Sequence, residues 1–321
     1  MRMIIPGIPR WAGRILTGWL VGLFLLPSST ASQQLTGPLV VFNAGSLAAP
    51  FRELLVEFRK LHPRVVPRQE SSGSLEAARK LTDLGKIPDV IGVADSLVIP
   101  SLLIPDHATW YATFGRNAMT LIYSDRSIGA REVNGQNWWT VLQRQGVRTG
   151  RSDPALDPNG YRTLLVVQLA ERYYGQAGLG DKLLKAMPPR YMRPKEADLV
   201  AMVQAGELDY AWSYRSIAIT TGLPSVELPR EIDLSDPGLG MLYSQASVKV
   251  PGSGGDLEVR GAPIIYALTI PTRAVHRPAA QAFVRFVFSP EGQAILENHG
   301  FLPMDRPIVG GPGRPPAGVV P

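Results

Sequence analysis

Strand-like and helix-like segments alternate through most of this chain, and this alternation constrains its fold more than any other feature. Residues 39–42 form a short apolar run typical of a buried strand, and residues 49–61 follow with apolar side chains at helical spacing. Residues 89–93 repeat the strand pattern, and residues 96–103 follow as a short helix. Such alternation is typical of proteins in which helices cover a central sheet. The sequence therefore predicts an α/β fold.

The same two patterns continue towards the end of the chain. We expect helices at 74–84, 138–143, 161–174, 196–204, 279–288 and 290–298, and strands at 118–123, 208–213, 248–250 and 264–270. Two blocks of strands and helices, followed by a return of helices, indicate two lobes joined by more than one crossing. Because ligands commonly bind between such lobes, we expect a site in the cleft between them.

The candidate crossings are residues 118–123 on the way out and 264–270 on the way back. The predicted boundaries are 38–118 plus 273–307 for lobe I, 119–272 for lobe II and 308–321 for a C-terminal tail. The tail is rich in proline and glycine, so we expect it to be disordered.

The first residues have the order of an export signal. Arginines precede an apolar run at 16–26, and small residues follow up to Ser32. The apolar run is short for a helix that spans a bilayer. We therefore expect a signal peptide at residues 1–32, cleaved near residue 31, and a protein exported to the periplasm. An uncleaved N-terminal anchor is the alternative.

The composition excludes several classes of function. The chain carries a formal net charge of +6 without a dense run of lysine and arginine, so nucleic-acid binding is not expected. It has no cysteine, which excludes disulfides, thiol catalysis and cysteine-ligated zinc. The four histidines are scattered, and neither a nucleophile elbow nor a P-loop occurs. A mildly basic folded body suits a small anionic ligand.

Four predicted helices begin at small or acidic residues. These starts are Gly45-Ser46, Gly73-Ser74, Asp157-Pro158-Asn159 and Lys195-Glu196. The first N–H groups of a helix have no partner inside the helix, and the helix dipole is positive at that end, so such a start can bind an anion. Serine and aspartate are also preferred there as ordinary N-caps. The pattern alone leaves both interpretations open.

A collinear series of motifs resembles one known family. Phe42-Asn43-Ala44-Gly45-Ser46-Leu47, followed by Pro50-Phe51, resembles the start of the archaeal-type molybdate/tungstate-binding proteins of ABC importers. Further matches, in the same order, are Glu70-Ser71-Ser72-Gly73-Ser74, Ala94-Asp95-Ser96, Arg116-Asn117-Ala118-Met119, Asp157-Pro158-Asn159-Gly160-Tyr161-Arg162, Arg193-Pro194-Lys195-Glu196, Leu208-Asp209-Tyr210, Tyr214-Arg215-Ser216, Glu227-Leu228-Pro229 and Ile232-Asp233-Leu234. The resemblance runs from residue 39 to about residue 303. It implies a type II periplasmic-binding fold: two lobes, each with a central mixed sheet flanked by helices, and a ligand cleft between them.

The resemblance also implies roles for individual residues. The residues expected to bind the oxyanion are Gly45, Ser46 and Ser74 in the first lobe and Asp157, Pro158, Asn159, Glu196 and Tyr214 in the second. The two serines and the tyrosine would supply hydroxyl donors, and Pro158 and Asn159 would line the site with backbone groups. Two departures stand out. The stretch between Gly160 and Arg193 is shorter than in archaeal members, which could change how Glu196 enters the cleft, and Asn159 stands where a cysteine is common.

The two carboxylates carry the expected selectivity. In this family, the resemblance implies, oxygens of Asp157 and Glu196 approach the metal atom of molybdate or tungstate and expand it to six-coordinate. Hard carboxylate oxygens suit such a metal centre. Sulfur and phosphorus do not readily expand in this way. For sulfate the carboxylates would therefore contribute only repulsion, about 4 kcal/mol per pair of charges at ~4 Å and an effective dielectric near 20.

The expected function is capture of molybdate or tungstate for the membrane permease of an ABC importer. We expect a monomer that is not an enzyme and has no cofactor besides its bound ligand. Three alternatives remain: binding of another tetrahedral oxyanion such as sulfate or phosphate, a sensory module for a signalling receptor, and a periplasmic hydrolase. In the hydrolase, Asp157 and Glu196 would form an acid/base pair, but no aromatic sugar platform or acid cluster accompanies them.

Overall fold

The computed structural model describes residues 1, 3–4, 7, 34–252 and 255–321. Apart from four positions, the predicted signal peptide lies outside these residues. Residues 35–321 form one packed unit, and the fold described below is that of this unit. Within the described residues, no helix has both the length and the apolar character needed to cross a membrane.

The order of strands and helices agrees with an α/β fold. The strands are β1 (Gly37–Ala44), β2 (Val65–Ser72), β3 (Val90–Val93), β4 (Tyr111–Arg116), β5 (Met119–Tyr123), β6 (Thr149–Ser152), β7 (Met192–Arg193), β8 (Tyr210–Tyr214), β9 (Ser225–Val226), β10 (Ser247–Gly252), β11 (Gly255–Arg260), β12 (Ile265–Thr269) and β13 (Val309–Gly310). The helices are α1 (Ala48–Leu61), α2 (Ser74–Thr82), α3 (Trp138–Val141), α4 (Pro158–Tyr173), α5 (Leu179–Ala186), α6 (Glu196–Ala205), α7 (Arg215–Thr221), α8 (Gly240–Tyr243), α9 (Arg277–Val287) and α10 (Pro290–Asn298). Short helical turns are η1 (Gly45–Leu47), η2 (Ile99–Leu103), η3 (Pro189–Tyr191) and η4 (Pro237–Leu239).

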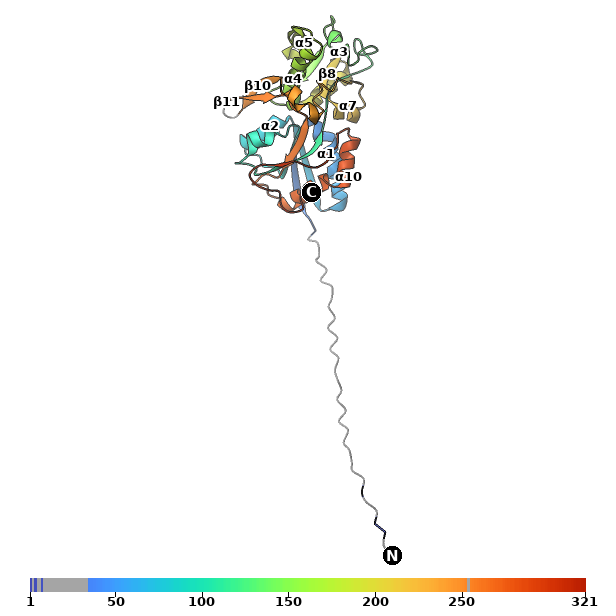
Figure 1. The fold of residues 1–321 in the computed structure, drawn as a ribbon, viewed down its shortest axis with the longest axis vertical. Helices are drawn as coiled ribbons and strands as arrows, with labels where there is room; N and C mark the ends of the chain where they lie inside the picture. Colours follow the sequence, from blue (N-terminus) through green and yellow to red (C-terminus); the bar gives the residue numbers. More distant parts are fainter. Residues whose placement is uncertain (2, 5–6, 8–33, 253–254) are drawn as a thin grey trace. The chain divides into compact units, whose positions relative to one another are not determined.

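The first lobe is built on a six-stranded mixed sheet with the order β13-β4-β12-β3-β1-β2. Strand β1 runs parallel to β2 and β3, whereas β12 runs antiparallel to β3 and β4. Figure 1 shows α1, α2 and α10 around this sheet. Helix α1 forms because its apolar side chains repeat at helical spacing, and it buries Phe51 and Phe58. Both rings meet Phe283 of α9 edge to face, which fixes the helix layer on the sheet.

The second lobe is built on a five-stranded sheet with the order β7-β6-β8-β5-β9. Strand β8 runs parallel to β6 and antiparallel to β5. Helices α3, α4 and α5 gather around this sheet in Figure 1. Its core includes Trp138 and Trp212, whose rings pack edge to face at 5.4 Å. The antiparallel pair β10 and β11 forms a separate hairpin, and Gln168 of α4 holds it by two hydrogen bonds to Ser247.

Two crossings join the lobes. The chain leaves the first sheet after β4, passes Asn117 and enters the second sheet as β5. It returns through Ile264 into β12, and the backbone N–H of Asn117 donates to the Ile264 carbonyl at 3.2 Å. The crossings therefore lie side by side. Because β12 pairs with β3 and β4, the predicted end of lobe II at residue 272 is wrong: the second lobe ends before this strand.

The expectation of a disordered tail at 308–321 is also wrong. Strand β13 pairs with β4 at the edge of the first sheet. Near the end of the chain, Val319 is 1 % exposed and belongs to the hydrophobic core. The Gly318 carbonyl accepts a hydrogen bond from Arg285 of α9 at 2.8 Å. The Pro/Gly-rich composition therefore shapes an extended segment that covers the first lobe.

Candidate functional site

The first-lobe residues of the predicted site lie where two parallel strands end. Gly45 and Ser46 begin the turn η1 after β1, and Ser74 is the first residue of α2 after β2. Because β1 and β2 are paired in parallel register up to Ala44 and Ser72, both turns lie at the same edge of the sheet. Ser46 is 3 % exposed and Ser74 fully buried.

Each of these two serine hydroxyls already has a protein partner. The Ser46 Oγ lies 2.8 Å from the Tyr266 hydroxyl, and the Ser74 Oγ accepts from the backbone N–H of Ala94 at 2.9 Å. A hydroxyl that accepts one hydrogen bond can still donate its proton, so Ser74 remains a donor for an anion.

The second-lobe residues also lie at helix starts. Asp157 is the N-cap of α4, and its Oδ1 accepts from the backbone N–H of Asn159 at 3.0 Å. Pro158 occupies the first helical position, where its missing N–H costs no hydrogen bond. Glu196 is the first residue of α6 and is 1 % exposed, and Tyr214 ends β8 in the interior. Burial of both acids at helix N-termini is typical of a site and not of a solvated surface.

Glu196 uses only one of its two oxygens within the protein. Its Oε1 accepts from the Ser213 hydroxyl at 2.5 Å and from the Tyr214 backbone N–H at 2.9 Å. The Asn159 side-chain amide adds a longer contact at 3.5 Å to the same oxygen. In the part of the chain that the structure describes, no hydrogen bond is found for Oε2. The carboxylate is therefore held by one oxygen and can offer the other to a ligand.

The electrostatics of the two acids are unfavourable without a ligand. Burial and, to a smaller extent, the nearby Asp157 carboxylate raise the pKa of Glu196 to about 8. Burial also raises the pKa of Asp157 to about 6, although the Asn159 amide and the Arg162 guanidinium oppose this rise. Such values arise when charges are taken out of water without full compensation. Strongly perturbed acids in a buried cluster are typical of functional sites.

Asn159 is one of four described residues that have a buried side-chain polar atom without a hydrogen-bond partner. It is fully buried, yet its Oδ1 has no hydrogen-bond partner among the described residues. An unpaired buried polar atom costs about 1–3 kcal/mol, so it usually marks strain or a missing ligand or water.

Arg162 is a central residue to which the sequence analysis assigned no role. It is 3 % exposed, and its Nη1 donates to the Ala94 carbonyl at 2.7 Å and to the Tyr214 hydroxyl at 3.0 Å. Its Nη2 lies 3.4 Å from Asp95 Oδ2. Arg162 belongs to α4 of the second lobe, whereas Ala94 and Asp95 follow β3 of the first lobe. One buried cation therefore joins the lobes and leaves the Tyr214 hydroxyl proton free to donate elsewhere.

The sequence contains a signal for Arg162 and Asp95 but none for Tyr266. Arg162 and Asp95 both stand inside motifs that carry the family resemblance, and Arg162 lies next to the apolar run that continues α4. No signal in the sequence points to Tyr266, which pairs with Ser46 from β12.

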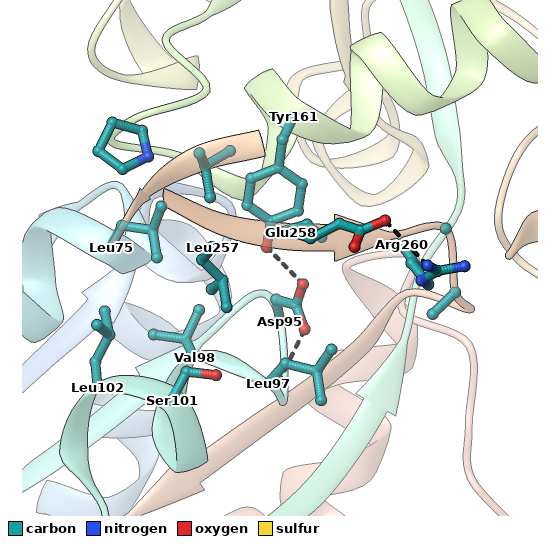
Figure 2. A pocket seen from close by; sticks show the side chains of 15 residues that line it. Leu75, Asp95, Leu97, Val98, Ser101, Leu102, Tyr161, Leu257, Glu258 and Arg260 are labelled. Atoms are coloured by element: carbon teal, nitrogen blue, oxygen red, sulfur yellow. Dashed lines mark hydrogen bonds and ion pairs between the residues drawn. The ribbon is translucent and has the colours of Figure 1, made fainter. Parts of the chain in front are cut away.

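A cavity lies beside this group of residues. Figure 2 shows Asp95 accepting hydrogen bonds from the Tyr161 hydroxyl and from the backbone N–H of Leu97. The cavity has a volume of about 270 Å³ and is lined mainly by apolar side chains of α2, η2 and the β10–β11 hairpin. Its lining combines residues of the first lobe with the hairpin held by the second.

The structure thus brings the predicted residues together at the contact between the lobes. Helix α6 packs against η1, which places the start of α6 near Ser46. Gly73 lies against Leu156 and Asp157, which places Ser74 near the start of α4. The role of these eight residues as ligand contacts stays a prediction. Within 34–252 and 255–321, no group of three or more His, Asp or Glu side chains is arranged to hold a metal ion.

Comparisons with known proteins agree with the two-lobe α/β fold. Residues 39–302 match the family model described as "Bacterial extracellular solute-binding protein". An uncharacterized solute-binding protein of Petrotoga mobilis is 42% identical over 88% of this chain and 88% of its own length. The molybdate/tungstate-binding protein WtpA of Pyrococcus abyssi is 35% identical over 84% of this chain and 86% of its own length. The periplasmic molybdate-binding protein of Azotobacter vinelandii has a similar fold, with a TM-score of 0.61 at 17% identity, over 82% of this chain and 98% of that one.

Proposed function

This chain belongs to the family of bacterial extracellular solute-binding proteins, and we propose that it captures molybdate or tungstate between its two lobes for the permease of an ABC importer. The family and the two-lobe fold expected from the sequence are confirmed by the family match and by the similar solved structure. The match to the relative named for molybdate and tungstate covers most of both chains. This match supports the same ligand class for the protein.

The observation that carries the proposal is the pair of buried acids at the contact between the lobes. Asp157 Oδ1 and Glu196 Oε1 accept hydrogen bonds from the groups around them. Among the described residues no hydrogen bond is found for the second oxygen of Glu196, which is then available to the metal atom of the bound oxyanion, with Asp157 beside it. Bonds to that atom would offset the repulsion between carboxylates and a dianion, which is about 4 kcal/mol at ~4 Å in a partly shielded site. Sulfate offers no such bond.

The remaining predicted residues supply a positive electrostatic potential and hydrogen-bond donors for the oxyanion. The starts of α2, α4 and α6 lie at the contact between the lobes, where the positive ends of the helix dipoles favour an anion. The hydroxyls of Ser46, Ser74 and Tyr214 are donors to oxo groups. Arg162 adds a buried positive charge that does not need to touch the ligand, because its Nη1 is already bound to Ala94 and Tyr214. Closure of the two lobes around the anion would then create the form that a permease recognises.

The family supports several further parts of this proposal on which the geometry of the site does not bear. We propose that the protein is exported to the periplasm, acts as a monomer, catalyses no reaction and carries no cofactor besides its ligand. Asp157 and Glu196 are proposed as ligands of the transported metal centre.

Calorimetric titration of residues 33–321 with molybdate, tungstate and sulfate tests the proposal directly. We expect molybdate and tungstate to bind and to raise the Tm at micromolar concentration, because a ligand that binds only the native state stabilises it. Sulfate at tenfold excess should leave the Tm unchanged. Equal shifts with sulfate would refute the role of the two acids.

A matched variant distinguishes the loss of a bond to the metal atom from a loss of fold stability. Asp157→Asn keeps a residue that is equally good as an N-cap and removes a buried charge, so the ligand-free protein should be at least as stable as the wild type at pH 7. Molybdate affinity should fall at least a hundredfold, because the amide cannot replace the anionic oxygen donor. X-ray absorption at the metal edge adds the coordination number. A four-coordinate metal in the wild-type complex would contradict the proposed bonds.

A further inference from the structure

Helix α2 of the first lobe is capped by the second lobe. Its N-cap residue is Gly73, which has no side chain to accept a hydrogen bond from the first turn. The backbone N–H of Glu76 donates instead to the Leu156 carbonyl at 3.3 Å. Leu156 directly precedes Asp157, the N-cap of α4. The start of α2 therefore binds Leu156, the residue directly before Asp157, which is a proposed ligand of the metal atom.

Gly73 allows this approach by having no Cβ. A Cβ at this position would lie 2.2 Å from the Leu156 carbonyl oxygen and 3.1 Å from the Asp157 Cβ. The backbone of Gly73 has φ −60° and ψ 148°, which any residue adopts without strain. Every close neighbour of such a Cβ belongs to the second lobe. The need for glycine therefore comes from the contact between the lobes and not from the conformation of the first lobe.

Arg79, on the same helix, makes two further contacts with the second lobe. Its Nη1 donates to the Ala155 carbonyl at 2.9 Å, and its Nη2 donates to the Pro251 carbonyl of β10 at 2.7 Å. The first carbonyl belongs to the turn before Asp157, and the second to the hairpin that Gln168 ties to α4. Lys80, the next residue, pairs only with Glu70 and Glu76 of its own lobe among the described residues.

We propose that Gly73 and Arg79 are positioning residues that hold the second lobe closed and place Asp157 beside Ser74. The inference rests on the proposed function, because its effect is read from oxyanion binding. Three hydrogen bonds join α2 to the second lobe: one from the Glu76 N–H to Leu156, and two from Arg79 to Ala155 and Pro251. Each of them breaks when the lobes separate. Ligand escape then requires the loss of all three.

Two variants and a control test this arrangement by stopped-flow binding of molybdate. Arg79→Gln should dissociate molybdate roughly tenfold faster or more, because two hydrogen bonds from a charged donor are lost. The association rate should change by less than about threefold, since the open form lacks these contacts. Arg79→Lys, which can donate to one carbonyl at a time, should restore part of the slow dissociation. Lys80→Gln removes a charge one residue away and should behave as the wild type.

Gly73→Ala is the steric counterpart. The ligand-free Tm should change by less than about 2 °C, because alanine fits the backbone conformation of Gly73. Small-angle scattering should show that molybdate lowers the radius of gyration of the wild type and not of Gly73→Ala. If Gly73→Ala and Arg79→Gln both close and release molybdate as the wild type does, the inference is overturned. Failure of the wild type itself to bind molybdate would refute the proposed function instead.

Discussion

Glu196→Gln is expected to stabilise the ligand-free protein at high pH while removing molybdate binding. The substitution keeps the size of the side chain, and the glutamine Oε1 can still accept from Ser213 and from the Tyr214 N–H. It removes the charge that burial disfavours. A change in stability can therefore be attributed to the lost charge and not to lost hydrogen bonds.

The direction follows from the raised pKa of Glu196. Its ordinary value of 4.5 applies to the unfolded chain, and in the folded protein the value is about 8. Below pH 4.5 both states hold the proton, so the group contributes no penalty. Between the two values only the folded state holds it, so the free energy of unfolding falls as the pH rises. The full penalty is reached above pH 8.

The size of the penalty follows from the same shift. Each pKa unit corresponds to ~1.4 kcal/mol, so the shift from 4.5 to about 8 corresponds to roughly 3–5 kcal/mol. The raised pKa of Asp157 adds a penalty of the same sign that is present in both proteins. The difference between wild type and variant therefore reports the burial of Glu196 together with its repulsion from Asp157.

Urea unfolding at half-unit intervals from pH 5 to pH 9 measures this difference. The variant should be nearly as stable as the wild type at pH 5 and more stable by roughly 3–5 kcal/mol at pH 9. Glu207→Gln, at an exposed position, is the control and should give a difference that does not vary with pH. A constant offset between Glu196→Gln and wild type across the whole range would show that Glu196 does not titrate as argued.

Two further predictions concern the buried cation and the C-terminal segment. Arg162→Met should lower the free energy of unfolding by about 3–5 kcal/mol at pH 7, because Asp95 is left buried without its partner. The double variant with Asp95→Asn should recover part of that loss in the same urea titration, and an additive result would contradict the pairing. Removal of residues 308–321 should lower the free energy of unfolding by roughly 2 kcal/mol, because Val319 and β13 leave the first lobe. A truncated protein with an unchanged Tm would mean that the segment does not contribute to the fold.

Local sequence patterns predicted most of the individual elements. The strand before Gly45 and the helices that start near Ser74 and Glu196 all occur, because apolar spacing and helix-start residues act within a few positions of the chain. Predictions that depended on composition alone did less well. The sequence predicted only a short strand at 248–250, whereas the structure has the β10–β11 hairpin at 247–260. Helices α5 and α7 and strand β4 were not predicted.

The sequence by itself determined the family, most of the strands and helices in their order, and the two acids placed at helix starts, because each of these is carried by neighbouring residues. Only the tertiary structure decided which sheet receives β12, how the chain end packs, and that Arg162 reaches Asp95 across the two lobes. It also decided that Glu196 keeps one oxygen free, since the donors to the other come from a strand that follows it in the chain. These features depend on contacts between distant segments, and a local pattern carries no information about which distant partner a residue will meet.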